Sequence, residues 1–347
     1  MTTINNNFDV FRTGDGTVSK YIHEDGSETA IKLVKSIQSI VNPLTKEIEV
    51  RKTDRNKYSI FISSSVGCYM ACKFCHLTLK NAKHIKITED VVFENLKEAI
   101  LEKMEFNPEL ATRYVKLSWM GMGDAINKPD MVYNVTLKIL DWIFENKLAI
   151  GLDGVDLSTV MPKLPNTAWI KSFHDLEEQL HKYPINPIYS MDNIEYTNGF
   201  YSHKNIFRLF YSIESAIQEK REEVIPNAMP LLQAIQQLKE YEQGGKYTLI
   251  LHHLLVHDLN DTEEELTALI DLMNTHFEKN ELRILRYNFC TKSNYKESER
   301  FLKQIRDLSN SIDFIKVQVS PGTEVSAACG QFIVKDFITK RKNNVNN

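Results

Sequence analysis

Apolar stretches bounded by turn residues alternate with stretches of helical periodicity along most of this chain. Apolar runs bounded by turn residues predict strands, and apolar positions that repeat every three or four residues predict helices. The predicted strands span 58–64, 114–120, 155–159, 206–212, 247–256, 283–287 and 314–319. The predicted helices span 88–104, 129–145, 219–241, 262–277 and 295–308. Repeated alternation of strand and helix implies parallel strands joined by helical crossovers, and hence an open or closed α/β barrel.

The same pattern divides the chain into three parts. Residues 1–57 form a small N-terminal extension, for which we predict one helix at 30–41 that ends at Asn42-Pro43. Residues 58–320 form the barrel, and residues 321–347 form a C-terminal segment that carries Cys329. Between about 163 and 204 the chain is longer than one crossover helix requires. Long irregular inserts in compact domains are typical of functional loops or lids, which is the interpretation we favour.

Composition and charge narrow the class of protein. With 347 residues, 42% of them hydrophobic and 25% charged, the chain is globular, which excludes a disordered or collagen-like chain. No apolar stretch approaches the roughly 20 residues of a bilayer helix, and the N-terminus lacks the features of a signal peptide. We therefore expect a cytoplasmic protein without a membrane partner. The net charge of −4 argues against a surface built entirely for nucleic acid, but it allows local basic patches.

Two groups of basic residues qualify as such patches, although solvated surface charge explains each group equally well. They are Arg51, Lys52, Arg55 and Lys57, and Lys80, Lys83, His84 and Lys86.

Three of the five cysteines lie within eight residues, spaced Cys68-x3-Cys72-x2-Cys75, with Phe74 before the third. A clustered, odd set without a secretion signal indicates metal or redox chemistry and not a disulfide framework. Three thiolates on one loop can hold three irons of a four-iron cluster and leave the fourth open to another ligand. Zinc is the competing explanation, but structural zinc needs four ligands and no second pair is suitably spaced. A chance group of buried cysteines is the remaining alternative.

This cysteine spacing, on a loop after the first barrel strand, resembles that of the radical S-adenosylmethionine (SAM) superfamily. The resemblance implies an open, partial TIM-like β/α barrel, a 4Fe-4S cluster held by Cys68, Cys72 and Cys75, and SAM as the second cofactor. In that superfamily the open iron binds SAM, and one electron cleaves SAM to a 5′-deoxyadenosyl radical.

Further segments resemble one branch, the RlmN/Cfr-type synthases that methylate an adenine carbon in RNA. The segments are ISSSVGCYMACKFC, SWMGMGDAINKPD, LSTVMP, YSIESA, VHDLNDT and SPGTEVSAACGQF, in the family's order and spacing. In the second segment Asp124 and Ala125 replace the family's Glu and Pro. Read alone, these positions would be ordinary turns and helix caps. By resemblance, the residues that contact SAM are Gly121, Gly123, Asp124, Ser158, Thr159, Ser212 and Asn288.

The resemblance also implies a mechanism. One SAM methylates Cys329, and a second SAM generates the radical that removes hydrogen from the new methyl group, whose carbon then adds to carbon 2 or carbon 8 of adenine. In the family, a cysteine seven residues before the first cluster cysteine releases the product. Phe61 occupies that position here. Either Cys290 substitutes as the resolving thiol, or release follows another path, or the reaction differs; we favour Cys290 slightly.

The implied partners are an RNA substrate, rRNA or tRNA, and a reductant such as flavodoxin or ferredoxin. A radical SAM enzyme with a non-RNA substrate is the alternative, because Phe61 departs from the pattern and the family's RNA-binding extension is reduced to about 57 residues. A non-catalytic iron-sulfur sensor is a third possibility. The series of SAM-contacting positions at several strand ends argues against the sensor.

Overall fold

The structure is a computed structural model. It describes residues 2–5, 8–34, 37–41, 48–52, 56–164, 166–187, 205–288, 294–300, 303–304, 307–308, 311–312, 315–318, 322–327 and 331–333.

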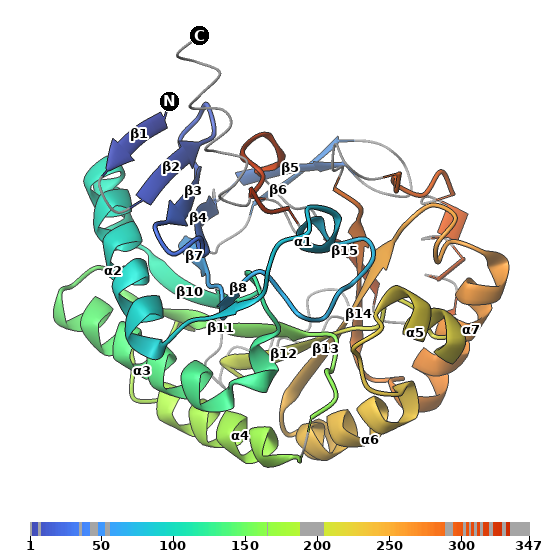
Figure 1. Cartoon of the computed structure of the whole chain (residues 1–347). Helices are drawn as coiled ribbons and strands as arrows, with labels where there is room; N and C mark the ends of the chain where they lie inside the picture. The colour runs from blue at the N-terminus through green and yellow to red at the C-terminus, as the bar shows by residue number, and fades with distance from the viewer. Residues whose placement is uncertain are drawn as a thin grey trace, which may run out of the picture.

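A curved sheet of 11 strands organises the described residues (Figure 1). Its strands, in spatial order, are β1 (Thr2–Asn5), β2 (Phe8–Arg12), β3 (Val18–His23), β4 (Glu28–Val34), β7 (Lys57–Phe61), β10 (Tyr114–Trp119), β11 (Gly151–Thr159), β12 (Phe207–Ser212), β13 (Thr248–Leu255), β14 (Glu281–Arg286) and β15 (Ile315–Gln318). The strands from β7 to β15 are parallel, and they correspond to the seven strands predicted from the sequence. The strands β1 and β15 are the two ends of the sheet, so the barrel is open, and the predicted fold class is confirmed.

The first four strands form an antiparallel meander that joins the barrel sheet through the β4–β7 pair. The N-terminal extension therefore continues the barrel sheet. Two small antiparallel pairs complete the strands: β5 (Ile37–Val41) with β6 (Ile48–Lys52), and β8 (Ser65–Val66) with β9 (Ile85–Lys86).

The longer helices cover the convex side of the sheet, and the four-residue helix α1 lies on its concave side (Figure 1). The α-helices are α1 (His76–Leu79), α2 (Glu89–Phe106), α3 (Pro129–Glu145), α4 (Ala168–Leu180), α5 (Gln218–Val224), α6 (Leu231–Glu242) and α7 (Glu263–His276), and the short 3-10 turns are η1 (Pro108–Thr112), η2 (Ala125–Asn127), η4 (Gln243–Gly245) and η5 (Thr323–Val325). Local chemistry sets their starts: the Thr88 and Thr262 hydroxyls accept hydrogen bonds from the first turns of α2 and α7, and Pro129 opens α3. None of the described helices has the length and apolarity to cross a membrane.

Three helix predictions need correction. Residues 30–41 contain β4 and β5, because apolar positions on two strands separated by two residues also fit a helical period. The predicted helix 219–241 is two helices, α5 and α6, since Pro226 and Pro230 cannot continue a helical hydrogen-bond ladder. The predicted helix 295–308 is not helical over 295–300, where Glu297 forms a β-bridge with Val256, but the described residues 303, 304, 307 and 308 are helical. The insert 163–204 begins with a helix, α4.

Candidate active site

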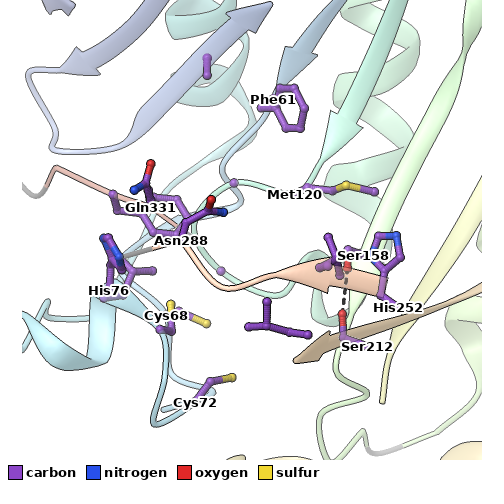
Figure 2. A pocket seen from close by; sticks show the side chains of 18 of the residues that line it. Phe61, Cys68, Cys72, His76, Met120, Ser158, Ser212, His252, Asn288 and Gln331 are labelled. Carbon is purple, nitrogen blue, oxygen red and sulfur yellow. Dashed lines mark hydrogen bonds between the residues drawn. The ribbon is translucent and has the colours of Figure 1, made fainter. Parts of the chain in front are cut away.

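A cavity of about 380 Å³ opens at the carboxyl ends of the parallel strands. Two walls of this cavity are important. The barrel wall comprises every predicted cluster and SAM residue: Cys68, Cys72, Cys75, Gly121, Gly123, Asp124, Ser158, Thr159, Ser212 and Asn288. The sheet wall comprises Lys20, Glu28, Ala30, Lys32 and Phe61, which come from β3, β4 and β7. Figure 2 shows Phe61 across the cavity from Cys72.

The cysteine loop runs from β8 to α1 and is anchored by one apolar side chain. Met70 is 1% exposed and packs with Val224, Ile225 and Ala228. Val224 is the last residue of α5, and the other two follow it in the chain. The amide of Lys73 donates to the Val224 carbonyl at 2.9 Å, which ties the loop to the same element. Buried apolar contacts of this kind hold the three thiols at the cavity before any metal binds.

The three thiols are not joined in disulfides, and burial shapes the acidity of Cys68 and Cys72. Burial raises the pKa of Cys68 to about 12, and the neighbouring Cys75 and Asp124 add to the rise. Burial also raises the pKa of Cys72 well above its ordinary value, with Cys75 and Cys68 as further causes. Partly buried thiols with raised pKa values stay protonated unless a cationic group binds them, so the donor set fits a metal cluster.

The number of thiols fits a cluster with one open iron. Cys68, Cys72 and Cys75 supply three ligands from one loop beside the cavity, as a four-iron cluster that binds another ligand requires. A structural zinc site is usually closed by four protein ligands.

The turn after β10 packs directly against the residues that precede the cysteines. Gly123 has a φ of +90°, and a Cβ there would lie 2.4 Å from the Ser65 hydroxyl and 2.5 Å from the Ser64 hydroxyl. The Met122 amide donates to the Ser63 hydroxyl at 3.0 Å. Glycine is therefore required for the close packing of this turn against the cysteine loop.

Asp124 joins the ends of two neighbouring strands. Its Oδ2 accepts hydrogen bonds from the Val160 amide at 2.9 Å and the Thr159 hydroxyl at 3.1 Å, and its Oδ1 accepts from the Ile126 amide. Burial raises the pKa of Asp124 to about 6, despite these three donors. A cationic ligand group beside Asp124 would favour the ionised form.

Two serines at adjacent strand ends complete the predicted polar positions of the barrel wall. The Ser158 and Ser212 hydroxyls lie 3.4 Å apart, as Figure 2 shows. Both side chains border the cavity, so they are placed to bind a ligand as well as each other.

The C-terminal segment contacts both walls. Its residues Ala327, Gln331 and Phe332 line the cavity. The Lys80 ammonium donates to the Phe332 carbonyl, and Lys20 donates to the Gln331 carbonyl at 3.5 Å. The two predicted catalytic thiols, Cys290 and Cys329, lie outside the described residues.

Comparison with known proteins identifies the lineage. The chain is 25% identical over 338 residues to the dual-specificity RNA methyltransferase RlmN of Campylobacter hominis, covering 95% of this chain and 80% of that protein. It is 23% identical to RlmN of Nitratiruptor sp., covering 89% and 79%. A radical SAM methyltransferase from Sphaerobacter thermophilus superposes with a TM-score of 0.63 at 16% identity, covering 95% and 80%. The chain is a distant relative of the RlmN methyltransferases. No family model matches it.

The departure from the RlmN pattern at position 61 lies within the cavity. Phe61 ends β7 and packs with Val18, Ala30 and Ala327. The Lys32 ammonium lies 4.5 Å from the centre of its ring, a cation–π contact. An aromatic ring thus occupies the place where the RlmN pattern has a thiol.

Sequence reasoning missed several cavity residues. Glu214 is 5% exposed with a φ of +56°, its Oε2 has no hydrogen-bond partner, and burial raises its pKa to about 8. His252 is likewise buried, with an unpartnered Nε2, and burial lowers its pKa to about 3. Only their positions in the sequence and the sheet could have indicated that they border the cavity. Glu214 follows Ser212 by two residues, and His252 pairs with Ser212 across β12 and β13. The charged residues of the sheet wall carried no motif.

Proposed function

We propose that this RlmN relative is a radical SAM enzyme that methylates carbon 2 or carbon 8 of an adenine in RNA through a methylated Cys329. The observation that carries the proposal is the barrel wall, where all predicted cluster and SAM residues border one cavity. A 4Fe-4S cluster on Cys68, Cys72 and Cys75 would supply the electron that cleaves SAM. Flavodoxin or ferredoxin is the proposed electron donor. The RNA substrate is proposed because the relatives are RNA methyltransferases.

The residues of the barrel wall have separate roles in this proposal. Asp124 binds the ammonium group of SAM, which compensates for the burial of its carboxylate. Gly121 and Gly123 let the backbone approach the ligand. The polar side chains that hold the rest of SAM are Ser158, Thr159, Ser212 and Asn288.

Cys329 accepts the first methyl group in this proposal. Its thiolate attacks the methyl carbon of SAM, the carbon–sulfur bond of the sulfonium breaks, and S-adenosylhomocysteine leaves. Since Phe61 has no thiol, we propose that the Cys290 thiolate attacks the Cys329 sulfur at the end of the reaction. A disulfide forms, the bond from that sulfur to the transferred carbon breaks, and its electron pair takes up a proton to give the methyl group of the released base.

A radical SAM enzyme with a non-RNA substrate is the second candidate function. The observation that favours it is Phe61 in the cavity, because an inherited site without the resolving thiol can serve another reaction.

Mass spectrometry of the protein purified from cells tests the proposal. Wild type is expected to carry one methyl group on Cys329 in part of the population. After reaction with total RNA, Cys290→Ala should keep that methylation but accumulate protein joined covalently to an RNA fragment. An unmodified Cys329 under all conditions would favour the non-RNA candidate. Normal turnover of Cys290→Ala would remove Cys290 from the mechanism and leave Cys329 in place.

A further inference from the structure

The sheet wall contains a hollow centred on Ala30. In the register of the sheet, Ala30 lies between Lys20 of β3 and Phe61 of β7. Lys20, Ala30 and Phe61 all line the cavity, and the hollow is the part of the cavity beside the short side chain of Ala30. Glu28 and Lys32, two positions before and after on the same face of β4, border the hollow.

The two faces of these strands differ in chemistry. The opposite face carries Tyr21, Ile31, Tyr58 and Ile60, which are at most 1% exposed and belong to the main core with α2. The face toward the cavity carries the charged residues of the sheet wall, which are 2% to 6% exposed. Lys20 and Glu28 pair with each other and Lys32 lies over the Phe61 ring, so this face presents polar atoms to the cavity whereas the opposite face is apolar.

The charges of the hollow favour one class of occupant. The Lys20 ammonium and the Glu28 carboxylate form an ion pair of 2.6 Å, while Lys32 contributes a second ammonium over the Phe61 ring. A phosphate would be attracted by the lysines but repelled by Glu28. A flat heterocycle can accept a hydrogen bond from an ammonium, donate one to a carboxylate and pack against an aromatic ring, so it can use all three groups.

The hollow adjoins the segment that carries the proposed methyl acceptor. Ala327 packs against Ala30, and the Ile333 amide donates to Glu28 Oε1 at 2.8 Å. An occupant of the hollow would therefore contact the C-terminal segment on one side and the cavity on the other.

We propose that the hollow of the sheet wall binds the nucleobase of the RNA substrate, with Lys32 donating to a ring nitrogen and Phe61 in contact with the ring. The assignment rests on the proposed function, and it gives the N-terminal meander the task of presenting the base. SAM binding and cleavage belong to the barrel wall and do not require the hollow.

The test uses reconstituted enzyme saturated with S-adenosylhomocysteine and two RNA hairpins that differ at one loop position, an unpaired adenosine or an abasic site. Wild type should bind the adenosine hairpin roughly 5- to 150-fold more tightly, the range expected for one stacked base. Ala30→Leu fills the hollow and should reduce this ratio to about one, without changing affinity for the abasic hairpin. Lys32→Met should lower the ratio as well.

Lys103→Met is the matched control. Lys103 is 0% exposed and donates to the Gly16 carbonyl at 2.8 Å and the Ser19 hydroxyl at 2.9 Å, on the other face of the same meander. This variant should keep the wild-type ratio.

The outcomes separate the two proposals. An adenosine preference that survives in Ala30→Leu, with SAM cleavage intact, overturns the hollow alone. If Ala30→Leu does not cleave SAM, the site as a whole is disturbed and Lys32→Met becomes the deciding variant. An unchanged ratio of adenosine to abasic affinity in Lys32→Met then overturns the proposal that the hollow binds the base. A wild type that binds neither hairpin overturns both the hollow and the RNA substrate.

Discussion

The barrel wall and the sheet wall border the same cavity but are built in different ways. The barrel wall takes its residues from the carboxyl ends of parallel strands and the loops near them, where side chains from distant parts of the sequence converge at one edge. The sheet wall takes its residues from the antiparallel pairs β3–β4 and β4–β7, where every second side chain faces the cavity. The functional residues of the barrel wall lie in short sequence motifs. Those of the sheet wall are distributed over three strands, and only the register of these strands shows that they lie together.

If the two walls have separate tasks, variants of the barrel wall should affect SAM chemistry and variants of the sheet wall should spare it. The largest expected effect is the loss of the cluster. Cys72→Ala removes one of three iron ligands and should abolish both the visible absorption of the reconstituted cluster and the formation of 5′-deoxyadenosine. Lys32→Met should retain both.

The measurement is SAM cleavage under reducing, anaerobic conditions, with iron analysis of the same samples. Stoichiometric zinc in wild type, retained by Cys72→Ala, would contradict the cluster and with it the task given to the barrel wall.

Resemblance to a family pattern named the residues of the barrel wall, because each of its parts is local. The three cysteines, the Gly121–Gly123 turn and the strand-end serines each lie in a short window that can be compared with that pattern, although the turn and the serines read alone would be ordinary turns and caps. The sheet wall was not predictable for two reasons. Both faces of β3 are buried, with Lys20 at 4% and Tyr21 at 0% exposure, so it lacks the alternation that marks a strand. The apolar residues of β4 and β5 also fit a helical period, which concealed the pairing that brings Ala30 beside Phe61.

A smaller effect is expected from Asp124→Asn, which keeps the acceptor oxygen for the Val160 amide but removes the charge. Loss of a charge-assisted contact to the SAM ammonium should weaken binding roughly 10- to 150-fold at pH 8. Wild-type affinity should fall as the pH decreases through about 6, where Asp124 takes up a proton, and the Asn variant should not show this dependence. Titration calorimetry with SAM between pH 5 and 8 measures both effects.

Stability should change in the opposite direction. Because burial raises the pKa of Asp124 from 3.8 to about 6, the folded state binds the proton more tightly than the unfolded state does. The stability that this group contributes is therefore greatest at low pH and is lost as the pH rises through about 6. The melting temperature of Asp124→Asn should lie above that of wild type at pH 8 and approach it near pH 4.

Asp130→Asn is the control for SAM affinity, because Asp130 lies at the exposed start of α3. This variant should bind SAM as tightly as wild type does. A loss of affinity similar to that of Asp124→Asn would mean that the Asp124 effect is not local.

The smallest expected effect concerns the rim beside the barrel wall. Lys83 and Lys86 are exposed around β9, whereas Lys80 of the same basic group donates to the Phe332 carbonyl and serves the C-terminal segment. Replacing Lys83 and Lys86 by Gln should reduce the salt dependence of RNA binding by about one unit of log–log slope per lysine, if each contacts a phosphate.

Lys279→Gln is the control, because Lys279 is exposed just before β14, at the amino edge of the parallel strands. The preference for adenosine over the abasic site should be the same in all three proteins, since phosphate contacts carry no base information. If the double variant lost that preference while keeping the wild-type salt slope, the rim and not the sheet wall would be reading the base.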